Sequence, residues 1–313
     1  PYDKLAICTG ARPREVRLPG AELDGVHYLR SHHDAVRVRS AIATGRRAVI
    51  IGGGYLGLEV ACVLVQAGLE VTVLEAQARV LQRVAGAPVS RFYTRVHREA
   101  GVIVRTGAAV LALEGTGHVS AVRLADAGTV AADLVIVAVG AVPNVELAVR
   151  AGLAVDNGIV VDGNGTTDDP DIAAAGDCAN HPDPVAGSRV RHESVPNAMD
   201  RARVVAAVAC GKPPPPYAEP WFWSDQYDVK LQIAGLSCAY DELVIRGDPE
   251  SGRSFVAWYL ANGRLIAADC VNRPRDFLVA QRLLAARAPV DPGALRDESV
   301  NLADFVKTVA SGP

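Results

Sequence analysis

One segment, residues 48–75, restricts the possible fold more than any other part of the chain. An apolar run over 48–51 leads into the glycine pattern Gly52-x-Gly54-x-x-Gly57, and a helical pattern and a second apolar strand follow. Gly52 suits a tight turn, Gly54 lets the backbone approach a pyrophosphate, and Gly57 lets the helix pack on the strand. This strand–turn–helix–strand order predicts an α/β domain of the Rossmann type that binds a dinucleotide.

The second strand of this unit ends on Glu75, 18 residues after the last glycine. A carboxylate there accepts hydrogen bonds from the adenosine ribose and repels a 2′-phosphate, so the sequence predicts NADH rather than NADPH. The pyrophosphate is expected at the helix N-terminus, beside Tyr55 and Leu56, where free N–H groups favour an anion. Arg79 and Arg83 follow closely, and an arginine weakens this selectivity by pairing with a 2′-phosphate. We assign Arg83 to the NAD site. An ordinary Gly-rich turn does not explain Glu75.

Length and composition narrow the remaining possibilities. A chain of 313 residues is expected to form two or three domains. A formal net charge of −3 argues against nucleic acid as the main partner. The longest apolar stretch, Leu134–Val142, is too short to span a bilayer, and no leader-like segment opens the chain. We therefore expect no membrane partner and a cytoplasmic location.

The cysteines are scattered, without the spacing of a metal site, and no metal is predicted. Isolated thiols of this kind usually behave as small hydrophobic residues in a reducing compartment. They are Cys8, Cys62, Cys178, Cys210, Cys238 and Cys270.

The chain opens at Pro1 and enters a strand-like segment, 3–10, directly. We expect that an upstream part of the natural protein precedes it.

Further elements follow the dinucleotide unit. Helices are expected at Pro88–Ala100 and Asn197–Cys210, and the proline run 212–216 is a stiff connector. Two strands that flank Asn262-Gly263 predict a hairpin, and an amphipathic helix follows at Asp276–Arg287. The last part of the chain therefore reads as a separate α+β domain.

Several segments together resemble the flavin-dependent ferredoxin reductases of bacterial oxygenase systems, the putidaredoxin reductase and rhodocoxin reductase group. These reductases belong to the pyridine nucleotide-disulfide oxidoreductase superfamily, and the resemblance covers essentially the whole chain. The matching segments are Gly52-Gly-Gly-Tyr-Leu-Gly-Leu-Glu59, Pro88-Val-Ser-Arg-Phe-Tyr93, His97-Arg-Glu-Ala-Gly101, Arg105-Thr-Gly107, Gly176-Asp-Cys-Ala179, Glu193-Ser-Val-Pro-Asn197, Pro220-Trp-Phe-Trp-Ser-Asp-Gln-Tyr227 and Val271-Asn-Arg-Pro274.

The resemblance implies two Rossmann-like domains, with the NAD domain inserted in the FAD domain, and a C-terminal α+β domain. We expect part of the FAD domain at 1–42, the NAD domain at 43–142, the rest of the FAD domain at 143–217 and the reductase C-terminal domain at 218–313. The family's first Gly-rich fingerprint, for FAD, is missing from this sequence. Whether this chain alone binds FAD is therefore left open.

The resemblance also implies the flavin contacts. Asp177, in Gly176-Asp-Cys, matches the superfamily aspartate that binds the FAD ribitol, and a turn-forming aspartate is the alternative. The helix that opens at Ser194 and Val195 is expected to direct its first amides at the flavin and stabilise negative charge there. Trp223 is expected to cover the isoalloxazine, with simple core packing as the alternative. Thr9, Gly10 and Arg12 complete the predicted FAD site.

On the NAD side, the counterpart of Glu59 in relatives reaches the nicotinamide carboxamide, whereas an exposed helical glutamate is the alternative. Gly140 is expected to let the nicotinamide approach the flavin without an intervening side chain. The implied activity is electron transfer from NADH through FAD, singly, to a [2Fe–2S] ferredoxin that feeds a monooxygenase or dioxygenase. Hydride transfer needs no acid–base dyad, so Glu59 and Trp223 alone are named as catalytic residues.

Ferredoxins are usually acidic, so a basic docking patch is expected, with dispersed solvated arginines as the alternative. Relatives suggest a monomer or a weak dimer. The candidate docking residues are Arg189, Arg191, Arg201, Arg203, Arg273 and Arg275.

Other functions remain open at this point. Disulfide reductases of the same superfamily carry redox cysteines in the region missing here, but nothing after Trp221 resembles their His-Pro-Thr signature. The thioredoxin reductase subtype has Cys-x-x-Cys in its NAD domain, and 43–142 contains only Cys62. A non-catalytic sensor related to apoptosis-inducing factor and an inert NADH-binding fragment are further alternatives.

Overall fold

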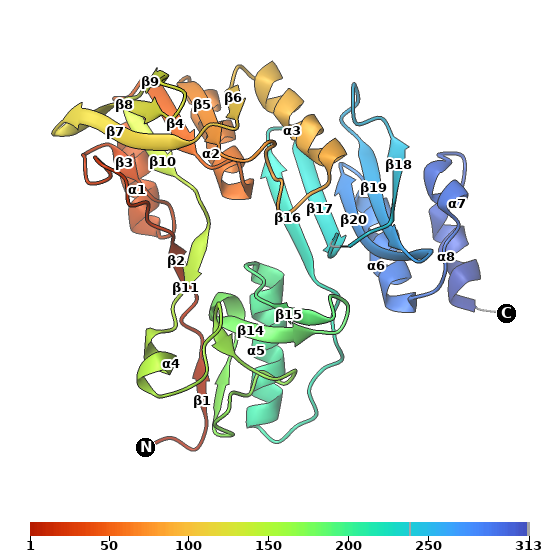
Figure 1. Cartoon of the computed structure of the whole chain (residues 1–313). Helices are drawn as coiled ribbons and strands as arrows, with labels where there is room; N and C mark the ends of the chain where they lie inside the picture. The colour runs from red at the N-terminus through yellow and green to blue at the C-terminus, as the bar shows by residue number, and fades with distance from the viewer. Residues whose placement is uncertain (238, 312–313) are drawn as a thin grey trace.

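The computed structural model describes residues 1–237 and 239–311 in three regions (Figure 1). The region that contains the N-terminus pairs β1 in parallel with β13 and arranges a second sheet in the order β12-β14-β15. Its elements are β1 (Leu5–Ile7), β12 (Ile159–Val160), β13 (Ile172–Ala174), β14 (Ala179–Asp183), β15 (Ser188–Val190), α4 (Glu146–Arg150), η1 (Gly176–Cys178) and α5 (Val195–Ala209).

The second region is built on a parallel five-stranded sheet in the order β3-β10-β4-β5-β6. A three-stranded antiparallel sheet, β7-β8-β9, lies beside it. Its elements are β3 (Val26–His27), α1 (His32–Ile42), β4 (Arg47–Ile51), α2 (Tyr55–Gln66), β5 (Glu70–Glu75), α3 (Ala87–Glu99), β6 (Ile103–Thr106), β7 (Val110–Thr116), β8 (His118–Leu124), β9 (Thr129–Ala131) and β10 (Leu134–Val137).

The third region is an antiparallel five-stranded sheet in the order β16-β17-β20-β19-β18, with helices on one face. Its elements are β16 (Trp221–Gln226), β17 (Val229–Gly235), β18 (Glu242–Gly247), β19 (Phe255–Ala261), β20 (Arg264–Val271), α6 (Pro274–Ala286), α7 (Pro292–Arg296) and α8 (Leu302–Ser311).

Thin connections join the N-terminal region to the other two. Strands β2 (Ala11–Pro13) and β11 (Ala141–Pro143) pair antiparallel and form a narrow bridge to the parallel-sheet region (Figure 1). A proline-rich segment, 212–220, leads from α5 to β16.

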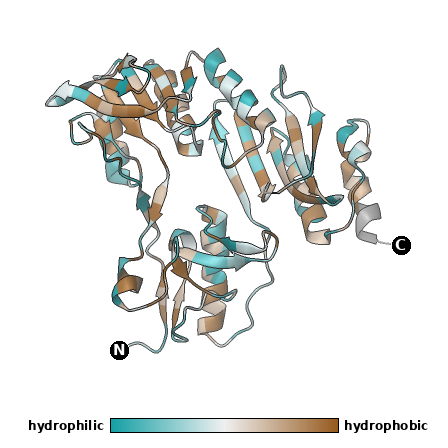
Figure 2. Ribbon diagram, in the orientation of Figure 1, coloured by the Kyte–Doolittle hydropathy of each residue, from teal (hydrophilic) through white to brown (hydrophobic). Residues whose placement is uncertain are grey.

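In contrast, the second and third regions share one hydrophobic core. Apolar residues of α2 and α3, such as Leu58 and Phe92, belong to the same buried cluster as Leu231, Phe255 and Val271 of the C-terminal sheet. The strands of both sheets are correspondingly rich in apolar residues (Figure 2). Because this burial drives the two regions together, they form one packed body.

Local signals explain where several elements begin and end. The hairpin expected at Asn262-Gly263 is confirmed, since β19 and β20 pair across it and both residues have positive φ. The helix expected from Asn197 begins earlier, at Val195, because Ser194 caps it by accepting from the Asn197 amide. Gly211, with φ +66°, follows its end.

The fold class expected from the sequence is confirmed as a mixed α/β structure with a Rossmann-like sheet and a C-terminal α+β region. Strand β3, from the segment expected to belong to the FAD domain, pairs with β10 in the sheet of the predicted NAD domain. The exact domain boundaries therefore stay a prediction. Five cysteines are free thiols, and Cys238 lies outside the described residues.

Candidate functional site

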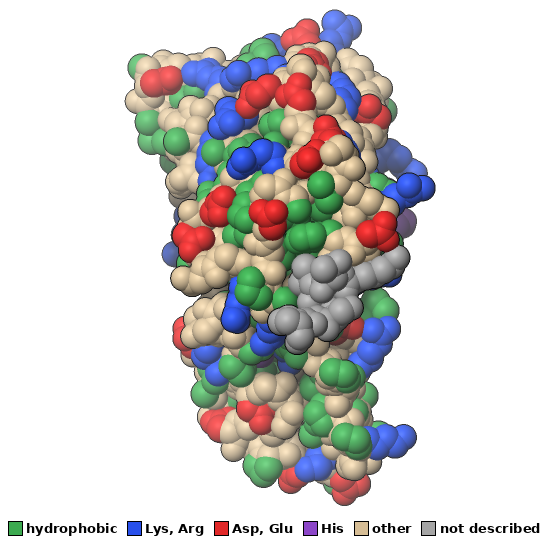
Figure 3. Space-filling model, turned by 90° about the vertical axis from the view of Figure 1, so that its right-hand side faces the viewer, with side chains coloured by type: hydrophobic (Ala, Val, Ile, Leu, Met, Phe, Trp, Pro, Cys, Tyr) green, Lys and Arg blue, Asp and Glu red, His purple; other side chains and the backbone are tan. Residues whose placement is uncertain are grey.

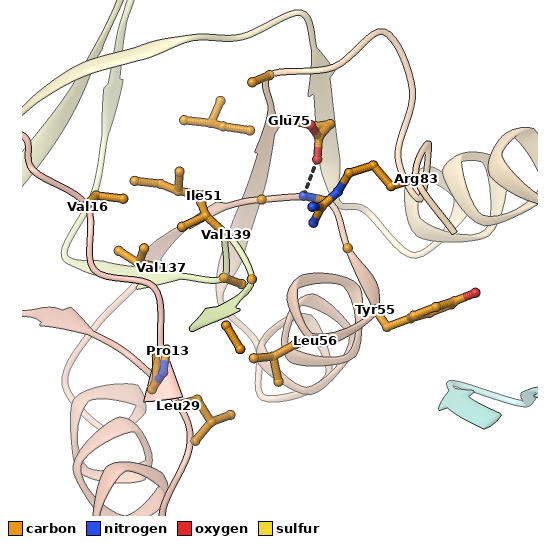
Figure 4. A pocket seen from close by; sticks show the side chains of 18 of the residues that line it. Pro13, Val16, Leu29, Ile51, Tyr55, Leu56, Glu75, Arg83, Val137 and Val139 are labelled. Carbon is orange, nitrogen blue, oxygen red and sulfur yellow. Dashed lines mark hydrogen bonds between the residues drawn. The ribbon is translucent and has the colours of Figure 1, made fainter. Parts of the chain in front are cut away.

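A cleft of about 970 Å³ opens at the carboxyl ends of β4, β5 and β10, where open parallel sheets bind their ligands. Figure 4 shows apolar side chains on one side of it, including Val137, Val139 and Leu56, and the glycine loop on another. Several predicted site residues from separate segments line it: Gly52, Gly54, Tyr55, Leu56, Glu59, Glu75, Arg83, Gly140 and Asp177.

The glycines of the loop have distinct steric environments. A Cβ on Gly52 would lie 2.3 Å from the Ala138 carbonyl oxygen, and one on Gly57 would lie 2.0 Å from the Gly52 carbonyl oxygen. A Cβ on Gly54 would meet no described atom within 4 Å. Gly54 is also the N-cap of α2, without a side-chain cap, so the first amides of the helix are left for an anion. The loop therefore fits a pyrophosphate.

Glu75 lies at the end of β5 and organises this loop. Its Oε2 accepts from the Gly53 amide and its Oε1 from the Gln77 amide, both at 2.7 Å (Figure 4). Each carboxylate oxygen has further lone pairs, so ribose hydroxyls can donate to the same group. The carboxylate is thus fixed by backbone bonds in the place expected of the nucleotide-selecting residue.

The two arginines near Glu75 differ in what they contact. Arg79 donates to the carbonyls of Gln82 and Ala85 and to Ser90, and so it braces its own loop. The exposed Arg83 points toward the glycine loop (Figure 4) and lies within 4 Å of a Cβ built on Gly140. Arg83 is therefore the arginine available to a nucleotide phosphate.

Glu59 projects from α2 into the cleft and is held there by the C-terminal region. Ser224 of β16 donates its hydroxyl hydrogen to Glu59 Oε1 at 2.6 Å. Burial raises the pKa of Glu59, and the Ser224 bond opposes that rise. Tyr55 turns away from the loop, and its ring packs 4.8 Å from that of Phe222.

On the other side of the cleft, Asp177 pairs with Arg30 at 3.2 Å. The Asp177 side chain is 16 % exposed, and the cleft lining includes Arg30. Behind it, Arg191 donates to the Asp177 backbone carbonyl. A fixed, partly exposed carboxylate in a cleft shared with the glycine loop fits the polyol hydroxyls of a flavin nucleotide.

The other residues expected at the flavin lie in two places. Asn144 exchanges hydrogen bonds with Thr9, and the backbone N–H of Asn144 donates to the Gly10 carbonyl. Arg12 donates to the Asn144 side chain and pairs with Glu146 at 2.8 Å. Thr9, Gly10 and Arg12 thus brace the narrow bridge, outside the lining of the cleft.

The start of α5 and the tryptophans of β16 complete the predicted set. Ser194 caps α5 and Val195 is 60 % exposed, which leaves this helix N-terminus open. The Trp223 ring lies 5.5 Å from that of Trp221, and Phe222 rather than Trp223 lines the cleft. The role of Trp223 at a flavin stays a prediction.

Sequence reasoning missed Arg30, Asn144, Phe222 and Ser224. Strand alternation was the available signal for two of them, because side chains at 222, 224 and 226 must share one face of β16. Arg30 and Asn144 gave no local signal, since their partners lie 147 and 135 residues away.

The candidate docking arginines are engaged to different degrees. Arg189 donates to the carbonyls of Val161 and Asn180, and the Arg191 side chain is 8 % exposed and paired with Glu193. Arg201 donates to the Gly163 carbonyl, Arg203 pairs with Asp200, and Arg273 pairs with Asp276 and Glu298. Arg203 and Arg275 are exposed. On the face that carries the C-terminal helices, acidic and basic side chains are mixed (Figure 3).

Within 1–237 and 239–311, no cluster of three or more His, Cys, Asp or Glu side chains has the arrangement of a metal site. No helix in that part of the chain is long and apolar enough to cross a membrane.

Comparison with known families gives two matches. Residues 1–202 match the pyridine nucleotide-disulphide oxidoreductase family, and residues 221–306 match the reductase C-terminal family.

Individual relatives are similar over nearly the whole chain. Putidaredoxin reductase CamA of Pseudomonas putida is 45% identical over 97% of this chain and 74% of that protein. Rhodocoxin reductase of Rhodococcus erythropolis is 42% identical over 96% of this chain and 70% of that protein. Among solved structures, the covalent putidaredoxin reductase–putidaredoxin complex superposes with a TM-score of 0.96 at 44% identity, covering 99% of this chain and 76% of that chain.

Proposed function

The chain belongs to the pyridine nucleotide-disulphide oxidoreductase family as a ferredoxin reductase, and we propose that it carries electrons from NADH through FAD to a [2Fe–2S] ferredoxin of an oxygenase system. The observation that carries this proposal is that the glycine loop and Asp177 line the same cleft. One predicted flavin contact, Asp177, therefore shares a cleft with the residues predicted for NADH, which supports direct transfer between two cofactors.

The residues on the NAD side of the cleft would bind NADH and orient its nicotinamide. The loop Gly52–Gly57 and the N-terminus of α2 would hold the pyrophosphate, with Tyr55 and Leu56 in the first turn. Glu75 would accept from the adenosine ribose, and Arg83 would meet a phosphate. Glu59 would accept from the nicotinamide carboxamide.

Gly140 has φ +98°, a conformation that favours glycine, and lines the cleft without a side chain. It would keep the path between the two cofactors open.

On the flavin side, Asp177 would accept from ribitol hydroxyls, and the amides at the start of α5, after Ser194 and at Val195, would face the ring. Thr9, Gly10 and Arg12 would act through the bridge, and Trp223 would cover the ring from β16. The chemistry that the bound flavin supplies is acceptance of a hydride and release of electrons one at a time. The positive end of α5 favours negative charge at that position.

The partner is proposed to be an acidic ferredoxin, attracted by arginines around α5 and α6. Arg189, Arg203 and Arg275 are the exposed members of the candidate set. Arg189, Arg191, Arg201, Arg203 and Arg273 have partners among the described residues. We propose a monomer or weak dimer that works in the cytoplasm.

The test is steady-state NADH oxidation by the flavin-loaded protein, with a [2Fe–2S] ferredoxin or a disulfide such as oxidised glutathione as acceptor. The proposal expects turnover with the ferredoxin and none with the disulfide. Turnover with the disulfide alone would contradict it and favour a disulfide reductase. Bound NADH without turnover on either acceptor would favour a sensor.

A further inference from the structure

Glu59 is the end of a series of hydrogen bonds that crosses between the C-terminal region and the parallel-sheet region three times. The Tyr227 hydroxyl and His97 Nδ1 are 3.0 Å apart, and His97 Nε2 and Gln226 Oε1 are 2.8 Å apart. Gln226 Nε2 donates to Ser224 Oγ at 3.0 Å, and Ser224 donates to Glu59 Oε1 at 2.6 Å. Tyr227 lies in the turn after β16, His97 on α3, Gln226 and Ser224 both on β16, and Glu59 on α2.

The donor and acceptor properties of these groups allow only one donor-to-acceptor direction along the series of hydrogen bonds. An ionised Glu59 only accepts, so Ser224 must give it its single hydroxyl hydrogen. Ser224 can then only accept from Gln226, which must present its amide nitrogen to Ser224 and its carbonyl to His97. His97 must therefore carry its proton on Nε2 and accept on Nδ1 from Tyr227. Every hydrogen bond in the chain points toward Glu59.

The hydrogen-bonded series is buried, so each of its hydrogen bonds is costly to break. His97, Ser224 and Gln226 are each no more than 1% exposed. Burial lowers the pKa of His97, which keeps the imidazole neutral, as the tautomer above requires. The backbone of Tyr227 is itself tied to α2, because its amide donates to Cys62 Sγ at 3.1 Å. A buried polar group that loses its hydrogen-bond partner costs free energy, so this arrangement of side chains is rigid.

We propose that Ser224 and Gln226 are positioning residues that hold the Glu59 carboxylate by one oxygen and leave the other for the nicotinamide carboxamide. This inference rests on the proposed function, because it assigns NADH to the cleft. It adds that orientation of the nicotinamide depends on the C-terminal region, through the strand that also carries Trp223.

The first experiment compares Ser224→Ala with Ser254→Ala, which removes a half-buried hydroxyl bonded to the Asn272 carbonyl at the ends of β19 and β20. Anaerobic stopped-flow reduction of the flavin-loaded protein by NADH gives the NADH affinity and the limiting hydride-transfer rate separately. We expect Ser224→Ala to lower the limiting rate about 10-fold and to weaken NADH binding, while Ser254→Ala matches the wild type. Ferredoxin reduction by dithionite-reduced protein should be unchanged in both variants.

Equal NADH reactions for the two variants would overturn the inference, and so would a loss confined to thermal stability. A wild-type flavin that NADH fails to reduce would instead refute the proposed function.

The second experiment requires no turnover. It uses ¹⁵N NMR of labelled histidines, with His97→Asn to assign the His97 signal. The inference expects a neutral His97 protonated on Nε2 at pH 7, and an imidazolium or an Nδ1–H tautomer would contradict it.

Discussion

At the scale of single residues, the Glu75 carboxylate accepts from the Gly53 and Gln77 amides and so fixes the glycine loop. In the proposed function, its remaining lone pairs would accept from the adenosine ribose. A group already held in place loses little conformational entropy when a ligand binds. The proposed function therefore predicts that nucleotide selectivity and loop geometry are linked at this residue.

Replacing Glu75 by alanine should narrow the preference for NADH over NADPH by about 10-fold or more, which corresponds to about 1.4 kcal/mol. The reason is loss of both the ribose acceptor and the repulsion of a 2′-phosphate. Measuring kcat/KM for both nucleotides checks this, with Glu70→Ala, exposed at the start of the same strand, as the control. An unchanged ratio would remove Glu75 from the account.

The exposed Arg83 should matter for the same selectivity, whereas Arg79 should not. Arg83→Ala is expected to weaken binding of NADPH more than of NADH, because the guanidinium is free to meet a 2′-phosphate. Equilibrium titration with both nucleotides measures this. Equal weakening for both would place Arg83 at the shared pyrophosphate instead.

At the scale of elements, the packing of β4 against α2 separates two glycines that look alike in the sequence. Gly54→Ala should preserve thermal stability and weaken NADH binding, because its Cβ enters open space where the pyrophosphate is expected. Gly57→Ala should lower stability, because its Cβ would meet the Gly52 carbonyl at 2.0 Å. Thermal unfolding and NADH titration of both variants provide the check. Similar losses of stability would contradict the assignment.

Strand β20 carries a buried carboxyl whose raised pKa predicts that stability depends on pH. Asp269 is fully buried and accepts from the Tyr259 hydroxyl, and burial raises its pKa to about 7. The folded state therefore holds this proton more tightly than the unfolded state, in which the pKa is about 4. Since the folded state binds more protons between these values, its stability falls as pH rises from about 4 to about 7.

Asp269→Asn should abolish that fall, since the amide oxygen still accepts from Tyr259 and cannot ionise. Denaturant unfolding at pH 5 and pH 8 measures the effect, and the wild type should lose stability relative to the variant by up to a few kcal/mol. The comparison cancels His97, whose lowered pKa makes stability fall in the opposite direction, as pH decreases. Parallel pH profiles would show that Asp269 ionises normally.

The sequence allowed prediction of elements whose causes are local. The glycine loop, the Asn262-Gly263 hairpin and the helix expected at Pro88–Ala100 depend on neighbouring residues, and the structure contains each of them. The contacts that build the cleft are not local. Ser224 and Glu59 are 165 residues apart, so only the pairing of the two regions brings them together. Neither segment alone therefore allowed prediction of the hydrogen bond between Ser224 and Glu59.

At the scale of the whole molecule, the parallel-sheet and C-terminal regions form one body, joined by a shared core. Ion pairs reinforce this contact, including Arg253 with Glu99 and Arg91 with Glu250. The N-terminal region has its own core and is attached by the β2–β11 bridge and the proline segment. The cleft lies at the junction, so its width depends on how these bodies sit relative to each other.

The proposed docking of an acidic partner depends on the charges over the whole molecular surface. Raising ionic strength should slow ferredoxin reduction more than reduction of a small neutral acceptor, because about 0.1 M salt screens exposed charges beyond about 10 Å. Arg203→Ala and Arg275→Ala should each weaken this salt dependence. Equal salt sensitivity for the two acceptors would exclude the arginine patch.

The most direct test of the central claim follows both redox centres in one anaerobic mixing experiment. The flavin-loaded protein is reduced with NADH and then mixed with an oxidised [2Fe–2S] ferredoxin, while both chromophores are recorded. The account predicts fast bleaching of the flavin by NADH and its reoxidation as the cluster is reduced. Bleaching by NADH with no electron transfer to any ferredoxin, under conditions in which the proteins associate, would contradict it.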